Sequence, residues 1–508
     1  MGHPSGRATF WPHPVYPVTA LRQILPPLLL LVLLASCANP ARTNRCVITD
    51  HGAVGDGQTL NTKAIQAAID QCAATGGGTL VVPKGTFLTG ALFFKQGVNL
   101  LIEKDGILKS TTRMADFPPV YTRWEGIERY WTPALLNFIG MTSVTVSGDG
   151  LIDGSGENWP RLARGGGRGF GRGGQLSGNN TLGGNSTTTT PDTFANTAPT
   201  GPLPKVADVY PPPLPRTDVI SLAPDPAHLP IINAAGIALP RGGLAPPRTL
   251  VFQNCRNVRV SGIHVLNEAR WGVVFIYTDD VVALNLNIRN PEHNIPSSDC
   301  MDIDSCRRVL VTGCYFECDD DCLSIKSGKD EDGRRVNRPS EDITIANTHF
   351  AFGEGGAAMG SETSGGIRRV LIRNCQFTDG NWAPIRFKSQ PSRGGVVEDI
   401  TYRDITLTNT RQAVEFNLDW SPRLSNGAPP AQVLPVVRNV KIINVSGTVR
   451  SVGVIHGLPG SPIENVVFQN CNITAQTGLT ITNARHLDLS GLHLTVANGD
   501  PVTQTNVQ

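Results

Sequence analysis

The chain has almost no net charge. Its 508 residues carry 44 Lys and Arg against 42 Asp and Glu, and only 17% of the residues are charged. Removal of a leader that contains two of the cations, Arg7 and Arg22, would leave 42 charges of each sign. A neutral chain has no long-range field that attracts DNA, RNA or an anionic lipid surface. We therefore expect no nucleic-acid partner.

The chain also lacks an apolar run that could cross a membrane as a helix. The run from Ile24 to Leu34 has 11 residues, whereas a membrane-spanning helix needs about 20. Arg22 precedes this run and small residues follow it, which is typical of a secretory signal. The residues around Cys37, Leu-Ala-Ser-Cys, resemble a bacterial lipobox, in which the cysteine is lipidated. The alternative is an ordinary cleaved signal. We predict a leader over residues 1–37 and an exported protein. It is either secreted or held in the cell envelope, at the outer membrane or in the periplasm, by a lipid on Cys37 alone.

Histidines do not accompany the cysteines at the spacing of a zinc site. Eleven cysteines are present, and five of them lie between Cys300 and Cys322. Export would permit disulfides, and Cys46 and Cys72 are a candidate pair. Cysteine is also a small apolar residue that packs well inside a repeat structure. We predict structural roles with the pairings open, and neither a metal nor another cofactor.

Amphipathic helices are almost absent, and a short strand-like repeat takes their place. In each repeat apolar residues alternate with polar ones, which predicts strands. The apolar anchors of successive repeats are Val258, Val281, Val309, Ile343, Val370, Ile400, Val440, Val466 and Leu487. Their spacing varies from 21 to 40 residues, which suggests a fixed coil with loops inserted at its corners. The sequence therefore predicts an all-β fold, a right-handed parallel β-helix.

One segment has helical periodicity, from Asn61 to Ala74. Asn61 could cap its start, and Gly76-Gly77-Gly78 follows its end. We predict that this helix covers the first coil of the β-helix and that residues 38–160 hold this cap and the first coils. Residues 161–247 are rich in Gly, Thr and Pro and are predicted to be an insertion, partly disordered. Residues 248–495 are predicted to form the catalytic coils of the β-helix, and residues 496–508 a C-terminal tail.

Three strand-like segments carry polar residues where alternation points them away from the core. These outward residues are Asp302 and Asp304, Ser324 and Lys326, and Arg386 and Lys388. We expect them to be exposed.

Acidic residues precede two of these strands. Asp299 lies before the first strand, and Asp319-Asp320-Asp321 lies before the second. Asp320 follows Asp299 by 21 residues. One coil of spacing would stack these acids on neighbouring turns. Opposed carboxylates beside cations suit hydrolysis of an acidic glycan, because one acid protonates the leaving oxygen while another activates water. Two alternatives remain, a set of turn residues with a solvated basic face, and a calcium site.

Several motifs resemble the polygalacturonases, glycoside hydrolase family 28. The early ones are His51-Gly52-Ala53-x-Gly55-Asp56-Gly57, Gly76-Gly77-Gly78-Thr79 and Gly148-x-Gly150-x-Ile152-Asp153-Gly154. The discriminating ones are Ser298-Asp299, Asp320-Asp321-Cys322-x-x-Ile325-Lys326-Ser327-Gly328, Met359-Gly360-Ser361-Glu362 and Arg386-Phe387-Lys388. The second of these is similar to the family's Gly-Asp-Asp-Cys motif, and the last to its Arg-Ile-Lys motif.

The resemblance implies an inverting hydrolase of α-1,4-galacturonosidic bonds that needs no metal. It implies that Asp320 is the general acid and that Asp299 and Asp321 position and activate the water. Arg386 and Lys388 would bind the carboxylates of a pectic polysaccharide or oligogalacturonide, and we also assign Lys326 to substrate binding. We expect a monomer.

The sequence departs from the family pattern at one active-site position. The family has Gly-His-Gly where this chain has Gly353-Glu354-Gly355. The charge of Glu354 would raise the pKa of neighbouring acids, and we include Glu354 among the catalytic residues. Smaller departures are Cys300, Asp319 and Phe387. Two alternative functions follow, a β-helix that binds pectic glycan without catalysis and a calcium-dependent lyase.

Overall fold

The structure is a computed structural model that describes residues 44–159, 245–378, 380–420 and 428–508. These residues belong to one unit, Asn44–Gln508. The predicted leader with Cys37 lies outside the described residues, and so does the predicted insertion except for its last three residues. Among the residues described, no helix is long and apolar enough to span a membrane.

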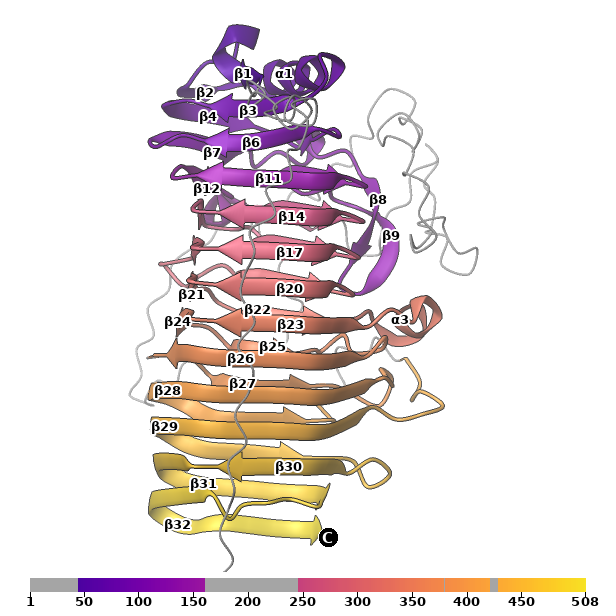
Figure 1. Ribbon diagram of the computed structural model, residues 1–508, viewed down its shortest axis with the longest axis vertical. Coiled ribbons are helices and arrows are strands. Elements are labelled where there is room, and N and C mark those ends of the chain that lie inside the picture. Colours follow the sequence, from indigo (N-terminus) through magenta and orange to yellow (C-terminus); the bar gives the residue numbers. More distant parts are fainter. Residues whose placement is uncertain (1–43, 160–244, 379, 421–427) are drawn as a thin grey trace, which may run out of the picture. The chain divides into compact units, whose positions relative to one another are not determined.

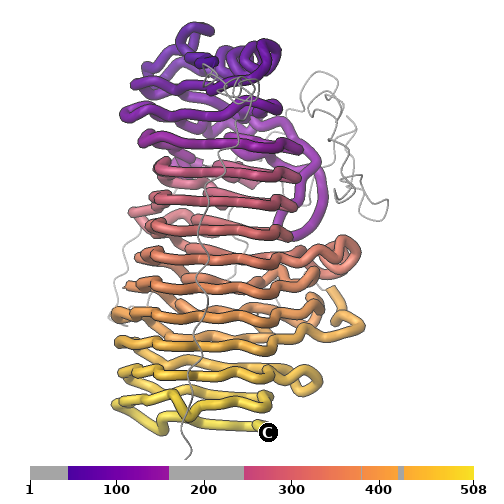
Figure 2. The backbone as a smooth tube through the Cα atoms, viewed as in Figure 1, coloured from indigo at the N-terminus to yellow at the C-terminus, as the bar shows by residue number. Residues whose placement is uncertain are grey.

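The described strands wind into a parallel β-helix (Figures 1 and 2). Thirty strands belong to one sheet, and the pairings between them are parallel. Right-handed crossovers are the rule for such connections. The predicted fold class is confirmed. Each coil contributes strands to three faces, called here the first, second and third face.

The strands of the first face follow one another up the stack. They are β1 (Arg45–Val47), β3 (Gly78–Val82), β6 (Val98–Ile102), β11 (Thr142–Gly148), β14 (Arg256–Ser261), β17 (Asp279–Leu284), β20 (Arg307–Thr312), β23 (Ser340–Ala346), β26 (Ile367–Phe377), β28 (Val396–Asn417), β29 (Val436–His456) and β30 (Ile463–Gln469). The later strands bend around the corners and so contribute to more than one face.

The second face is built from shorter strands. They are β2 (Asp56–Leu60), β4 (Gly85–Thr89), β7 (Gly106–Ser110), β12 (Leu151–Asp153), β15 (His264–Leu266), β18 (Asn287–Arg289), β21 (Tyr315–Glu317) and β24 (His349–Phe352), followed by the end of β26.

The third face carries the polar residues singled out above. Its strands are β5 (Leu92–Phe93), β10 (Leu136–Ile139), β13 (Leu250–Gln253), β16 (Val273–Ile276), β19 (Met301–Asp304), β22 (Asp321–Lys326), β25 (Gly355–Met359) and β27 (Ala383–Lys388), then the ends of β28 and β29, β31 (Cys471–Arg485) and β32 (Leu492–Val507). Residues assigned to a C-terminal tail thus lie in β32, which pairs with β31.

The repeat anchors pair in register, which is why their spacing was visible in the sequence. Val258 pairs with Val281, and Val281 with Val309. The same pairing continues through Ile343, Val370, Ile400, Val440 and Val466. A bridge between Val467 and Asp488 places Leu487 beside Val466. Each coil therefore adds one apolar layer to a continuous core, and the inserted loops leave the register unchanged.

The predicted cap helix is confirmed as α1 (Thr62–Ala74). Its buried residues pack on the first coil at the end of the stack where β1 lies (Figure 1). The predicted cap interaction of Asn61 is wrong. The Asn61 side chain hydrogen-bonds the backbone of Val54 and Thr59 instead of the helix N–H groups. Three short 3-10 turns, Ile48–His51, Met114–Asp116 and Gly156–Asn158, complete this half.

Aromatic side chains stack along the core. Phe94, Phe138, Phe252 and Phe275 have successive ring centroids 4.2, 4.7 and 5.2 Å apart. The ten described cysteines are all buried, and the candidate pair, Cys46 and Cys72, does not form a disulfide. They act as small apolar residues of the same layers.

Candidate active site

The three polar strand segments lie close together on the third face. Asp302 pairs with Ser324, and Asp304 pairs with Lys326. Two strands further along, beyond β25, Arg386 and Lys388 continue the same outward positions. The residues between them, such as Ile303 and Ile325, are in the core. The predicted alternation is therefore confirmed.

The predicted exposure of these residues is wrong. Asp302 is 0% exposed, and Lys326, Arg386 and Lys388 are each 4% exposed. They face away from the core but are covered by other side chains: Arg386 and Lys388 by their ion-pair partners, and Asp304 by Arg123. The sequence pattern shows only which face a side chain points to, and a segment that folds over that face decides whether water reaches it.

One covering segment is the antiparallel hairpin β8 (Val120–Trp124) and β9 (Ile127–Trp131). It lies beside the stack at the levels of β14, β17 and β20 (Figure 1). Arg123 Nη1 donates to Asp304 Oδ1 at 3.0 Å and to Ser305 Oγ at 2.8 Å. Beside it lies α3 (Asp330–Val336), whose Asp332 accepts a hydrogen bond from the Glu128 backbone. The sequence analysis predicted neither element.

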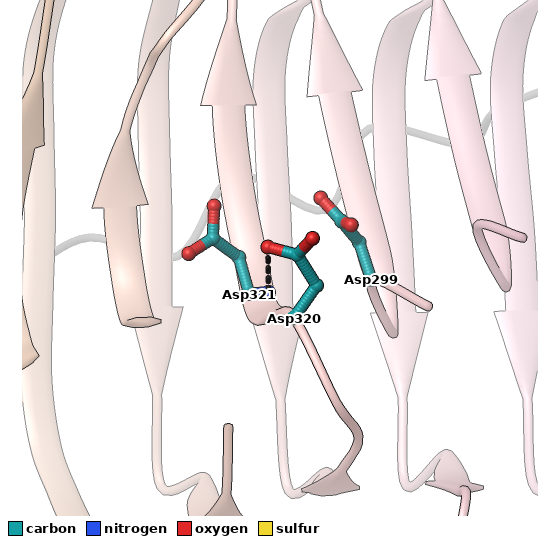
Figure 3. Close-up of side chains that lie close together, drawn as sticks. All are labelled: Asp299, Asp320 and Asp321. Atoms are coloured by element: carbon teal, nitrogen blue, oxygen red, sulfur yellow. Dashed lines mark hydrogen bonds between the residues drawn. The ribbon is translucent and has the colours of Figure 1, made fainter. Parts of the chain in front are cut away.

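Three carboxylates meet beside these strands. One side-chain oxygen each of Asp299, Asp320 and Asp321 lies within 4.8 Å of the others. Figure 3 shows the three side chains side by side, Asp320 and Asp321 on one coil and Asp299 on the neighbouring coil. The Asp321 backbone N–H donates to Asp320 Oδ1 at 3.0 Å, which orients that carboxyl group.

Asp321 is fully buried and held as a carboxylate. Arg386 Nη1 lies 3.1 Å from Asp321 Oδ1, and Lys388 Nζ and Ser324 Oγ both donate to Oδ2. Burial alone would raise the pKa of Asp321, but the charges of Lys388 and Arg386 outweigh it and hold the pKa well below its ordinary value. Asp321 is thus ionised across the physiological pH range.

Asp320 has the opposite tendency. Burial, followed by the negative charges of Asp321 and Glu354, raises the pKa of Asp320 to about 7. Lys388 and Arg386 oppose this rise but are engaged with Asp321. A carboxyl group with a pKa near neutrality beside an ionised one is the arrangement expected of an acid and base pair.

Asp299 is also buried, and its surroundings disfavour ionisation. Its pKa is raised well above the ordinary value by burial, then by Asp302 and Asp320. Lys326 Nζ lies 3.7 Å from Asp299 and 3.4 Å from Asp302. Burial also raises the pKa of Asp302, to about 8.

Lys326 is surrounded by acids. Besides the two aspartates, Glu362 accepts a hydrogen bond from its Nζ at 3.1 Å, and the ring of Trp271 lies 4.9 Å away. The positive charge of Lys326 thus offsets part of the negative charge of the acidic cluster.

Glu354 occupies the edge of the site. Its side chain is 55% exposed and lies 3.9 Å from Arg386 Nη1. Its backbone N–H donates to the Asp320 carbonyl at 2.8 Å. The predicted effect of its charge, a raised pKa at a neighbouring acid, is confirmed at Asp320.

Sequence reasoning gave no role to several residues of the site. Glu415 accepts from Arg386 Nε at 2.7 Å, and its strand pairing with Arg386 could be recognised only from the register. Glu362 belongs to the family motif that begins at Met359, so its place near the site could have been inferred from the sequence. No pattern in the sequence indicated Arg123 or Trp271, because their contacts with the site join segments that are far apart in the chain.

The acidic cluster is a poor calcium site. Calcium needs six to eight oxygen ligands, with carboxylates free to coordinate. Both oxygens of Asp321 are engaged by Arg386 and Lys388, and Lys326 lies against Asp299. Three cations at this place compete with a metal ion for the same carboxylates.

The fold and the site define a class of protein. A carboxyl group with a raised pKa, an ionised neighbour and cations for an acidic ligand, on the side of a parallel β-helix, are the elements of a glycoside hydrolase that acts on an acidic glycan.

Comparison with known proteins agrees with this class and makes it specific. Residues 236–491 match glycosyl hydrolases family 28, and residues 45–107 match the family described as rhamnogalacturonase A/epimerase, pectate lyase-like. The first match covers half of the chain. The protein belongs to glycosyl hydrolases family 28, the predicted polygalacturonase family, and is a pectin-degrading glycoside hydrolase by that membership.

Individual relatives are distant. The chain is 24% identical over 455 residues to a probable polygalacturonase of Vitis vinifera, covering 87% of this chain and 77% of the relative. It is 26% identical to an exo-poly-alpha-D-galacturonosidase of Dickeya chrysanthemi, covering 79% of this chain and 62% of the relative. The crystal structure of an exopolygalacturonase from Thermotoga maritima has a TM-score of 0.64 at 25% identity, covering 91% of this chain and 92% of that chain.

Proposed function

We propose that the protein hydrolyses α-1,4-galacturonosidic bonds of pectic polysaccharide with Asp320 as general acid. The single observation that carries this proposal is that Arg386 and Lys388 both pair with Asp321, the neighbour of Asp320. These cations keep Asp321 ionised, whereas burial and nearby negative charges raise the pKa of Asp320 to about 7. One site thus offers a proton and a base at the same pH.

In the proposed reaction the Asp320 carboxyl gives its proton to the glycosidic oxygen as the bond to the anomeric carbon breaks. Asp299 and Asp321 position and activate the water that attacks this carbon, and the proton of that water passes to this pair of carboxyls as the new C–O bond forms. Asp299, with its raised pKa, hydrogen-bonds that water. The products are two sugar chains with one new reducing end. Glu354 keeps Asp320 protonated by its charge.

The stereochemical part of the proposal is inversion, as the family resemblance implies. Inverting carboxyl pairs are typically about 6.5–9.5 Å apart, and retaining pairs about 5–5.5 Å. One carboxylate oxygen from each of the three aspartates lies within 4.8 Å of the others. This distance joins single oxygens and not whole carboxyl groups, so the anomer of the first product is the decisive measurement.

Recognition of the uronate falls to Arg386 and Lys388. Both cations are already paired with Asp321, and the ring of Trp420 lies 4.8 Å from Lys388 Nζ. A substrate carboxylate would add a second acceptor to these donors. Arg386 provides a planar fork suited to a carboxylate, and Lys388 a point charge.

The covered side of the third face supports cleavage from a chain end. On the coils before Asp299, the outward residues Val251, Val274 and Ile276 are buried. Thr122 of β8 donates to Gln253 Oε1 at 2.6 Å on this face. This packing favours extension of a glycan from the acids toward the C-terminal coils. The relatives from D. chrysanthemi and T. maritima carry exo-acting names. We include exo action in the proposal.

Export is part of the proposal too, and it rests on residues 24–37 of the sequence. A lipid on Cys37 would place the protein in the membrane fraction of cells. A Cys37→Ser variant would then be found in the soluble fraction, and a wild-type protein that is equally soluble would contradict lipidation.

The test of catalysis uses polygalacturonate in the presence of a chelator. New reducing ends without ultraviolet absorbance are expected, since a lyase would create an absorbing C=C bond. Asp320→Asn should lower kcat about 10²- to 10⁴-fold. Asp500→Asn, an exposed acid on the last strand, is the matched control. Loss of activity with the chelator, or an Asp320→Asn variant as active as the control, would refute the proposal. NMR of the first product assigns its anomer.

A further inference from the structure

The third face continues past the acids into a second polar depression. It has a volume of about 290 Å³ and is lined by Asn417, Asp419, Val454, His456, Thr480 and Thr482. Strand register connects it to the active site. Lys388 pairs with Asn417, Asn417 with His456, and His456 with Thr482. The depression therefore lies on the third face, on the C-terminal side of the acids.

The position fits sugar units beyond those at the acids. Neighbouring strands are about 4.8 Å apart. Asn417 is on the strand next to Lys388, and Thr482 is two strands further, so the depression extends roughly 5–14 Å past the Lys388 strand. A single sugar at the acids cannot reach this far, whereas a longer oligomer along the third face must pass over it.

The chemistry of the depression differs from that of the active site. Among the described residues that line it, none is Lys or Arg. They offer an amide, two hydroxyls, an imidazole and the methyl groups of Val454. Their one carboxylate is Asp419, which is exposed and whose backbone N–H donates to Asn417 Oδ1 at 3.0 Å.

A free uronate carboxylate here would face Asp419, with no Lys or Arg among the described lining residues to balance its charge. Hydroxyl groups of a sugar, by contrast, can donate to Asp419 and exchange hydrogen bonds with Asn417 and the threonines. An ester methyl group can pack on Val454. Charge repulsion at a partly exposed site is modest but selective.

We propose that this depression is a distal subsite for a sugar unit without a free carboxylate, either a methyl-esterified galacturonate or a neutral sugar. The inference rests on the proposed hydrolase function. The enzyme then recognises two sugar units of one glycan chain: a free uronate beside Arg386 and Lys388, and an uncharged unit further along the third face. Its preferred substrate is a partly esterified or mixed pectic chain.

The experiment compares kcat/KM for oligogalacturonides of equal length. One is fully de-esterified, one carries methyl esters only on its distal units, and one has neutral sugars there. A short de-esterified oligomer that ends before the depression reports on catalysis alone. Wild-type enzyme should prefer the uncharged distal units by up to about fivefold. The substrate with the higher kcat/KM, methyl-esterified or neutral, identifies which kind of sugar unit the depression binds.

Two variants of the exposed residues of β31 sharpen the test. Thr480→Lys puts a cation in the depression and should reverse the preference toward the de-esterified oligomer. Thr474→Lys adds the same charge to the same strand outside the depression and should keep the wild-type ratio. Equal or faster cleavage of the de-esterified oligomer by wild type, or no change of ratio in Thr480→Lys, would overturn the inference. Failure to cleave even the short oligomer would instead overturn the proposed function.

Discussion

Replacement of Glu354 by glutamine should shift the pH profile of the enzyme rather than abolish activity. The general acid must be protonated, and the pKa of Asp320 is about 7. Activity of the wild type should therefore fall as pH rises through about 7, approaching tenfold per pH unit beyond it. Glu354 is one cause of this high pKa, so its neutralisation lowers the pKa of Asp320 and moves the alkaline limb to lower pH.

The exposure of Glu354 limits the size of this shift. Its side chain is 55% exposed, and exposed charge pairs are worth about 0.2–1 kcal/mol. That range corresponds to roughly 0.1–0.7 pKa units. Activity of Glu354→Gln should match wild type at pH 5 and fall up to about fivefold below it above pH 7. Salt should screen the difference.

The assay is reducing-end release from polygalacturonate between pH 4 and 9, at low and high ionic strength. Glu354→His tests the residue that the family resemblance implies at this position, and it should shift the alkaline limb in the same direction. Asp500→Asn, an exposed acid far along the stack, controls for loss of one negative charge. An alkaline limb that stays in place or moves upward in Glu354→Gln would refute the electrostatic role of Glu354. Loss of activity at every pH would show that Glu354 takes part in the chemistry directly.

Two further predictions concern the ion pairs and the core. Lys388→Gln removes a charge that holds the pKa of Asp321 low, so that pKa should rise and the acidic limb of the pH profile should move to higher pH, with a higher KM for polygalacturonate; an acidic limb identical to wild type would contradict this pairing. Phe350→Ala removes a buried ring stacked 4.5 Å from Phe377 and should cost about 3–5 kcal/mol in denaturant unfolding. Leu310→Ala, at an exposed position of β20, should cost within about 0.5 kcal/mol, and equal losses in both variants would refute the proposed core packing.

The fold was predictable because the repeat is local. Each anchor, such as Val309 or Ile343, sits in a strand whose alternation is visible within a few residues, and the anchors pair in register whatever the length of the loop between them. Spacing also predicted that Asp299 and Asp320 come from neighbouring coils. The helix α1 was visible for the same reason, since its apolar stripe has a period of its own. The side-chain partners of Asn61 were not predictable, because an Asn at this place can hydrogen-bond either the helix N–H groups or the backbone of the preceding turn, and the conformation of that turn decides between them.

The sequence by itself determined which side chains face away from the core and which acids stack on adjacent turns, since both follow from strand periodicity and coil length. Only the tertiary structure decided how those side chains behave. Arg123 reaches Asp304 from 181 residues away, and the hairpin that carries it covers the face that alternation predicted to be exposed. Burial then separates the pKa values of Asp320 and Asp321, because desolvation acts on both while Lys388 and Arg386 compensate mainly one. The desolvation of a side chain depends on all the segments that pack around it, so the local sequence pattern of its own strand does not predict it.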